Sequence, residues 1–332
     1  MRARRTGTSI SAVWIRGGIE MKFNRKAKID TSQIVDRRGQ RSGGSGFRMP
    51  MGLSRGGGSM FPGSRAGGGI GLVAVVVVVL LVFVVPRLTG SGSSDGDATQ
   101  PTDLSQCSTG TGEPTLECRI GYDVTSVQDF WAQALPEQAD VPYEPAKIVW
   151  FTSSTPSGCG QATAGQGPFY CPVDKQVYLD PTFFHDMLQG QLGASGGDLA
   201  EAYVVAHEYG HHVQDLRGTL AKNQSSATGP TSASVRIELQ ADCFAGAWVH
   251  AASTVKDENG QILISGITEA DIAEAVNAAQ AVGDDRIQRQ TQGQVNEEQW
   301  THGSAAERVR WFTTGYRSGT IASCNTFAPD AL

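Results

Sequence analysis

The sequence has no Cys-x-x-Cys pair and no cysteine before Cys107. The spacing typical of zinc-thiolate clusters is therefore missing. All six cysteines lie in the C-terminal part of the chain, and an even count confined to one region indicates disulfides formed in an oxidising compartment. Pairing of near neighbours would join Cys107 to Cys118 and Cys159 to Cys171, which leaves Cys243 for Cys324. Other pairings remain open at this stage.

One stretch lacks charge altogether. Residues 70–85 read IGLVAVVVVVLLVFVV, and three glycines before them extend the uncharged run to 19 residues. This length reaches the lower end of what spans a bilayer as a helix. A buried strand is an alternative because valine favours strands, but the run is too long for one. A signal peptide would be shorter, nearer the start and followed by a cleavage site, so we expect an uncleaved membrane anchor at residues 70–88.

Charge is distributed unevenly about this run. The part before Ile70 holds 14 basic and 3 acidic residues, a net charge of +11, and the remainder carries −17. The positive-inside rule predicts a single-pass protein of the cell membrane with a cytoplasmic N-terminus and an extracytoplasmic C-terminal part. Residues 1–69 are rich in arginine and glycine and have little to bury, so we expect a disordered cytoplasmic tail. Its basic residues suit anionic lipid, and we expect no nucleic-acid partner.

The rest of the chain divides into two regions. Residues 89–103 are rich in Gly, Ser, Thr and Asp and predict a flexible linker. Residues 104–332 are numerous enough for one domain with its own core. The patterns in this domain predict helices over 126–135, 181–190 and 268–282 and strands over 147–153 and 168–180.

A His-Glu-x-x-His motif stands at His207, Glu208 and His211. Residues four apart lie on the same face of a helix, so both imidazoles can reach one metal ion while the carboxylate lies beside it. Apolar residues recur every three or four positions around the motif, and Asp198 with Glu201 resembles a capping box. The motif therefore predicts a zinc site on a helix. The alternative is a pair of surface or capping histidines without metal.

Catalytic zinc needs a third protein ligand and an open position. The segment 235–248 has helical periodicity and carries Glu238 and Asp242 one turn apart. Glu238 can bind zinc, and Asp242 can accept a hydrogen bond from the outer nitrogen of a ligand histidine. The small residues Ala241, Ala245 and Gly246 would let this helix approach the first closely. The alternative is an acidic pair on a solvated helix face.

Four segments together resemble one family. HEYGHHVQ, ELQADCFAGAW, NAAQAVGDD and THGS occur in this order, and the resemblance to neutral zinc metallopeptidases of bacterial membranes runs from Met21 to Phe327. We hypothesise that residues 1–20 precede the true start, which N-terminal sequencing would test. The resemblance implies an α+β fold with a zincin-like metallopeptidase domain, mainly helical with a small sheet. It implies that Glu238 is the third ligand and that the strand Gln176 to Asp180 is an exposed edge strand that binds substrate.

The THGS segment carries the remaining candidate. By its resemblance to related zincins, His302 would stabilise the oxyanion, with Arg308 supporting its orientation. This chain has Gly303 where those relatives have proline. The alternative is a histidine near a helix start. Asp284 and Asp285 are either supports of the site or loop partners of Arg286 or Arg289. We interpret His185, His212 and His250 as structural or surface residues.

The predicted function is a membrane-anchored zinc metallopeptidase with one catalytic Zn²⁺ and a peptide or protein substrate. In this mechanism zinc activates a water, and Glu208 is the general base that takes its proton. Two alternatives remain at this stage. One is a membrane-tethered binding or scaffold protein without catalysis, and the other is a zinc amidase acting on cell-wall peptide.

Overall fold

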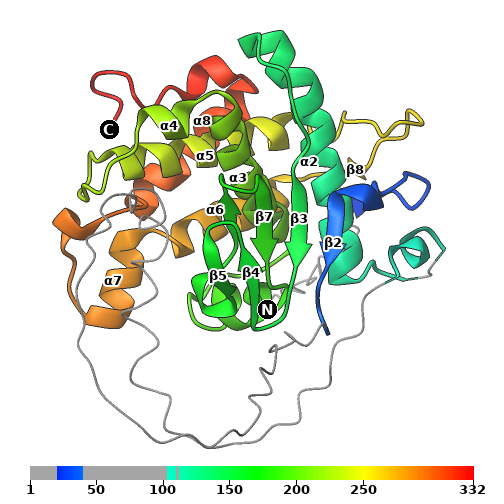
Figure 1. Ribbon diagram of the computed structural model, residues 1–332, viewed down its shortest axis with the longest axis horizontal. Coiled ribbons are helices and arrows are strands. Elements are labelled where there is room, and N and C mark those ends of the chain that lie inside the picture. The colour runs from blue at the N-terminus through cyan, green and yellow to red at the C-terminus, as the bar shows by residue number, and fades with distance from the viewer. Residues whose placement is uncertain (1–20, 40–102, 110–111) are drawn as a thin grey trace, which may run out of the picture.

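Five long helices form the body of the protein in the computed structural model, which describes residues 21–39, 103–109 and 112–332 (Figure 1). They are α2 (Leu116–Ala139), α3 (Asp198–Leu216), α5 (Ala233–Ala251), α6 (Glu269–Ala281) and α8 (Ala305–Ser318). Two shorter helices are α4 (Thr219–Lys222) and α7 (Asp284–Gln292). Helix α5 packs on α3 and α8, and α2 and α6 pack on α3. The prediction of a mainly helical α+β domain with a small sheet is confirmed.

The largest sheet has the strand order β2-β3-β7-β6. Strands β2 (Ile34–Asp36), β3 (Lys147–Trp150) and β7 (Gln176–Leu179) are parallel, and β6 (Phe169–Cys171) runs antiparallel to β7. Strands were predicted over 147–153 and 168–180, and the second prediction covers the β6–β7 hairpin. The expectation that 176–180 is an edge strand is wrong, because β3 and β7 pair along their whole lengths and β6 covers the other side of β7.

Residues 21–39 belong to the folded domain, which corrects the prediction of disorder over the whole of residues 1–69. Strand β1 (Lys22–Phe23) pairs with β8 (Ile264–Ser265), and β2 pairs with β3. Met21, Ala27 and Ile29 are buried in the core. A low apolar content does not prevent this segment from folding, because distant parts of the chain supply the surface against which its few apolar residues pack.

The predicted anchor at residues 70–88 lies outside the described residues, as do most of the predicted linker and residues 40–69 of the predicted tail. Within the described ranges, no helix combines the length and hydrophobicity needed to cross a membrane. Strands β4 (Ser154–Ser157) and β5 (Gly160–Thr163) form a separate hairpin. Residues Phe184–Gln189 form a π-helix within the predicted helix 181–190.

The start of α3 differs from the predicted cap. Gly197 precedes the helix, and Asp198 is its first residue rather than its N-cap. Glu201 binds the side chain of Arg119 on α2 at 2.8 Å instead of closing a capping box. The helix that was predicted over 126–135 is likewise longer, since Thr115 caps α2 well upstream. In contrast, α6 lies within the predicted helix 268–282, and Thr268 caps it in a capping box with Asp271.

Small residues let the central helices approach closely. A Cβ atom added at Gly210 of α3 would lie 3.1 Å from the Cα atom of Ala241 on α5, so the predicted close approach of these helices is confirmed. Gly246 faces α8 instead, because a Cβ atom there would lie 2.1 Å from the carbonyl oxygen of Phe312. The His-Glu-x-x-His motif is therefore carried on a tightly packed helical core.

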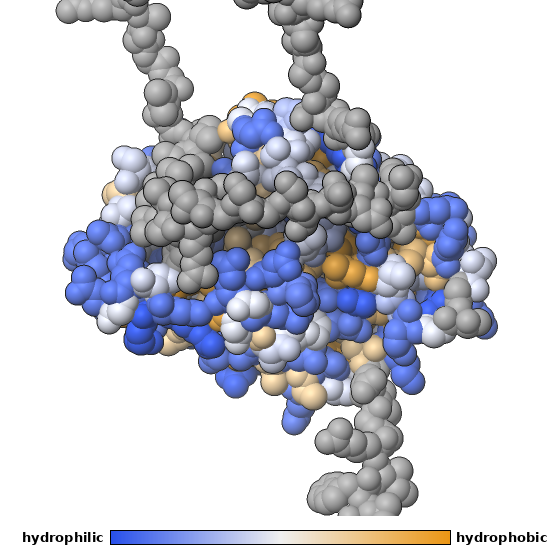
Figure 2. Space-filling view, turned by 90° about the horizontal axis from the view of Figure 1, so that it is seen from below, coloured by the Kyte–Doolittle hydropathy of each residue, from blue (hydrophilic) through white to orange (hydrophobic). Residues whose placement is uncertain are grey.

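The three predicted disulfides are present in the structure, joining Cys107 to Cys118, Cys159 to Cys171 and Cys243 to Cys324. The face seen in Figure 2 is mostly hydrophilic with small hydrophobic patches between polar residues. Among the described residues, only Val173 and Val295 expose a large hydrophobic side chain. The large apolar side chains of the described domain are thus used mainly for packing.

Candidate metal centre

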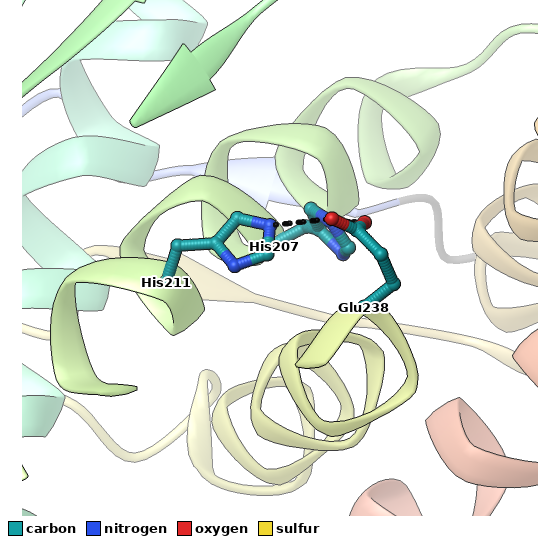
Figure 3. Close-up of side chains that lie close together, drawn as sticks. All are labelled: His207, His211 and Glu238. Carbon is teal, nitrogen blue, oxygen red and sulfur yellow. Dashed lines mark hydrogen bonds and ion pairs between the residues drawn. The ribbon is translucent and has the colours of Figure 1, made fainter. Parts of the chain in front are cut away.

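Two helices bring three potential metal ligands together. His207 and His211 lie one turn apart on α3, and Glu238 reaches them from α5 (Figure 3). One ligand atom from each of the three residues lies within 4.8 Å of the others. His207 and Glu238 are buried, and His211 is partly buried. The three residues singled out as ligands from the sequence thus converge at one point.

The distance from each histidine nitrogen to the carboxylate of Glu238 is close to the spacing of two ligands on a tetrahedral ion. The Nε2 atom of His207 lies 3.2 Å from Oε2 of Glu238, and Nε2 of His211 lies 3.5 Å from Oε1. Two donors held about 2.0–2.2 Å from a tetrahedral zinc ion would be about 3.4 Å apart. Two imidazoles and one carboxylate are also a ligand set typical of catalytic zinc, with one position left for a water or substrate.

The outer nitrogen of His207 has the acceptor that the sequence predicted. Its Nδ1 atom lies 2.8 Å from Oδ1 of Asp242, which is fully buried on α5. Tyr203 donates to the same carboxylate at 2.6 Å. Arg308 binds both of its oxygens, through Nε at 2.8 Å and Nη2 at 2.9 Å. This carboxylate fixes the Nδ1–H form of His207 and leaves Nε2 free for a metal ion.

The outer nitrogen of His211 has a different kind of acceptor. Its Nδ1 atom lies 2.9 Å from Oε1 of Gln214, which is completely buried on α3. Gln214 was not assigned from the sequence, although it lies one helical turn after His211 and ends the HEYGHHVQ segment, because glutamine is not a residue type that marks a metal site. The two histidines are thus held by one carboxylate and one neutral amide.

The electrostatics of the centre favour a positive ion. Burial raises the pKa of Glu238, but the charges of His211 and His302 and a hydrogen bond from His207 outweigh it, so this pKa falls well below its usual range. Burial also raises the pKa of Asp242, yet Arg308 and His207 hold it at about 2. Burial lowers the pKa of His207, but Asp242 and Glu238 raise it to about 10. Two ionised carboxylates therefore face the ligand nitrogens.

Glu208 lies on α3 between the two histidines and is buried with them. Burial raises the pKa of its carboxyl group, and the neighbouring His207 and His211 oppose the shift. A hydrogen bond from the backbone of Tyr170 on β6 lowers the pKa slightly. The carboxyl group is therefore more basic than an exposed glutamate, as proton transfer near neutral pH requires.

His302 is held by Asp284 rather than by Arg308. The Oδ2 atom of Asp284 accepts from the backbone N–H groups of Thr301, His302 and Gly303, and Oδ1 lies 3.5 Å from Nδ1 of His302. Burial lowers the pKa of His302, but the charges of Glu238 and Asp284 raise it. The prediction that Arg308 orients His302 is wrong, because this guanidinium binds Asp242.

Gly303, which stands where the related zincins have proline, adopts a backbone conformation that proline cannot adopt. Its φ angle is +87°, a region closed to proline, whose ring fixes φ near −65°. The loop is shaped instead by the three backbone hydrogen bonds to Asp284. The second acidic residue of this segment, Asp285, lies 3.8 Å from Arg289 and accepts from the backbone of Ala305. Of the two roles considered, Asp284 supports the site and Asp285 is a loop partner.

Residues 21–327 of the sequence match the family described as "Putative neutral zinc metallopeptidase". The chain belongs to this family. It is 37% identical over 314 residues to the uncharacterized protein YpfJ of Escherichia coli K12, covering 91% of this chain and 98% of the relative. It is 49% identical over 228 residues to the uncharacterized protein Rv2575 of Mycobacterium tuberculosis, covering 68% and 76%. No solved structure matches the chain significantly.

Within this member of the neutral zinc metallopeptidase family, the remaining histidines have structural surroundings. His212 is buried and lies 3.0 Å from the hydroxyl of Tyr170 and 2.6 Å from the carbonyl oxygen of Glu144. His250 lies 2.8 Å from the carbonyl oxygen of Tyr316, and His185 is exposed. None of the three belongs to the cluster of potential ligands in the described residues.

Proposed function

We propose that this protein is a zinc-dependent metallopeptidase with a zincin-like active site, in which His207, His211 and Glu238 hold one Zn²⁺. The observation that carries the proposal is the convergence of these three donors, within 4.8 Å of one another, beside the buried carboxyl group of Glu208. A closed structural site would instead need a fourth protein ligand. Family membership supports the same assignment.

The bound ion would polarise a substrate carbonyl and make a water acidic enough to attack it near neutral pH. Glu208 accepts the proton of that water and delivers it to the leaving amine, a role supported by its raised pKa. His302 donates a hydrogen bond to the oxyanion, and its raised pKa supports a protonated donor. Asp284 positions this histidine through the backbone of its own loop.

The free edge of β6 is the proposed binding place for an extended peptide. This strand lies at the end of the sheet, packs against α3 and reaches Glu208 through the backbone of Tyr170. A peptide that adds to an edge strand gains backbone hydrogen bonds independent of its side chains. The substrate-binding role that was predicted for residues 176–180 is therefore proposed for β6, the other strand of the same hairpin.

The test uses the full chain with Glu208→Gln, an isosteric change that removes the base and keeps the ligands. We expect the variant to retain zinc, measured by metal analysis, and to lose peptide hydrolysis by about 10²-fold or more. The matched control is His207→Ala, which should lose both zinc and activity.

A peptide library serves as substrate because the natural one is unspecified. Equal turnover by the wild type and Glu208→Gln would refute the general-base assignment. Zinc binding by a wild type that hydrolyses no peptide would favour a binding protein or an amidase with another substrate.

A further inference from the structure

A chain of buried amide groups connects His211 to the C-terminal disulfide. Gln214 on α3 donates from Nε2 to the carbonyl oxygen of Ile237 at 2.7 Å and to Oε1 of Gln240 at 3.2 Å. Gln240 on α5 donates from Nε2 to the carbonyl oxygen of Cys324 at 2.8 Å. Gln214 and Gln240 have exposed fractions of 0% and 4%, and Gln240 and Cys324 also line a surface pocket.

The direction of every bond in this chain is set at its far end. A backbone carbonyl can only accept, so the carbonyls of Ile237 and Cys324 orient the NH₂ groups of both glutamines toward them. The oxygen of Gln240 then faces Gln214, and the oxygen of Gln214 faces Nδ1 of His211. Because the oxygen of Gln214 can only accept, Nδ1 of His211 must carry the ring proton. Nε2 then has a free lone pair directed at the metal position.

We propose that Gln214 and Gln240 form a positioning relay that sets the tautomer and orientation of His211 for metal binding. Neither residue contacts the ion or a substrate. The relay is anchored where Cys324 is tied to Cys243 of α5 by a disulfide, so its last acceptor is held against the helix that carries Glu238. The inference rests on the proposed zinc site but concerns metal affinity, which is measured separately from hydrolysis.

The experiment measures the zinc dissociation constant of the full chain by competition with a chromophoric chelator. We expect Gln214→Leu to weaken zinc binding by about 10–100-fold, as loss of an outer hydrogen bond to a ligand histidine does. Gln240→Leu removes only the far link and should weaken binding by about 3–10-fold. The double variant should bind no more weakly than Gln214→Leu alone, because Gln240 acts only through Gln214.

The matched control is Gln128→Leu. Gln128 is 1% exposed and binds Gln33, Tyr143 and the backbone of Ala146, yet it is not connected to the metal ligands by these bonds. It should lower thermal stability without changing zinc affinity. The visible spectrum of bound Co²⁺ should shift in Gln214→Leu and not in Gln128→Leu.

The outcomes separate the two proposals. A wild type that binds no zinc would overturn the proposed function. If the wild type binds zinc and Gln240→Leu binds it with the same affinity, the relay is overturned and the proposed function stands. Gln240→Leu is the milder change and serves this test even if Gln214→Leu does not fold. Multiplicative effects in the double variant would show two independent structural contributions and would also overturn it.

Discussion

In the proposed metal site, Asp242 and Gln214 give His207 and His211 the same tautomer by different means. Asp242 is a buried carboxylate that also binds Arg308 and Tyr203, whereas Gln214 is a neutral amide. A carboxylate acceptor makes its imidazole the more basic ligand. His207 should therefore be the stronger ligand. Replacing its acceptor, Asp242, should weaken zinc binding more than replacing Gln214, the acceptor of His211.

The first prediction is that Asp242→Asn weakens zinc binding by about 10–100-fold. The new amide can place a donor opposite Nδ1 of His207, which would move the ring proton to Nε2 and block the ligand lone pair. The change also leaves Arg308 without its buried partner, so the free energy of unfolding should fall by about 3 kcal/mol. Chelator competition and chemical denaturation measure the two effects.

Asp285→Asn is the control, because the amide oxygen can still accept from the backbone of Ala305 and the ion pair that is lost, with the largely exposed Arg289, is 3.8 Å long. This variant should change neither the zinc affinity nor the free energy of unfolding by much. Zinc affinity in Asp242→Asn equal to that of the wild type would contradict the assigned role.

The sequence could assign those residues that combine helical spacing with a residue type typical of a metal site; Gln214, one turn after His211, has the spacing but not the type. The spacing of His207 and His211 on α3, and of Glu238 and Asp242 on α5, predicts their common faces from helical geometry alone. Gln240, Tyr203 and Asp284 act through partners from distant segments. A single sequence carries no pattern for such contacts. Arg308 was selected correctly for the site but matched to the wrong histidine for the same reason.

At the scale of elements, α5 and α8 touch along their backbones. A Cβ atom at Gly246 would lie 2.1 Å from the carbonyl oxygen of Phe312, and one at Gly315 would lie 1.8 Å from that of Cys243. Backbone atoms of two packed helices cannot turn aside as a flexible side chain can. We predict that Gly246→Ala lowers the free energy of unfolding by about 3 kcal/mol, measured by urea denaturation.

The control for this change is Arg317→Ala on the exposed side of α8, which should alter stability by less than about 0.5 kcal/mol. Gly246→Ala with wild-type stability would mean that the two helices are farther apart than described. The sequence indicated that Gly246 serves close packing but assigned it to α3, because small residues mark a contact without naming the partner.

Four carboxylates gather where the N-terminal segment meets α2. Burial raises the pKa of Asp129 to about 6, and the charges of Asp30, Asp257 and Glu258 add to the shift. An acid with a raised pKa binds its proton more tightly in the folded state, so stability falls as pH rises from about 4 to about 6. Because Asp129 is partly exposed, this loss should be only about 1 kcal/mol.

We predict that Asp129→Asn removes this loss and is about 1 kcal/mol more stable than the wild type at pH 7, with no advantage at pH 4. Denaturation curves at the two pH values measure the difference. An equal gain at both values would mean that side-chain packing, and not charge, is responsible.

At the scale of the whole molecule, residues 21–39 and residues 112–332 form one folded unit. Strand β2 pairs with β3, and Arg38 binds Glu117 on α2 at 2.8 Å. The uncharged run at residues 70–85 lies between these paired parts of the chain. A helix that crossed a membrane once within that run would place β2 and β3 on opposite sides, so a single crossing and this sheet cannot both hold. The sequence did not reveal the conflict because strands of two or three residues carry almost no periodic signal.

The last prediction is that residues 21–39 and residues 112–332 occupy the same compartment. Lys26 and Lys222 are exposed, and the described residues hold no free cysteine, so Lys26→Cys and Lys222→Cys supply single labelling sites. In intact cells a membrane-impermeant maleimide should label both variants or neither. A Lys22→Cys/Ser265→Cys pair, which lies directly across β1 and β8, should form a disulfide if that compartment is oxidising. Labelling of one site in intact cells and of the other only after permeabilisation would mean that the chain crosses the membrane once and that the N-terminal strands do not join this sheet in the cell.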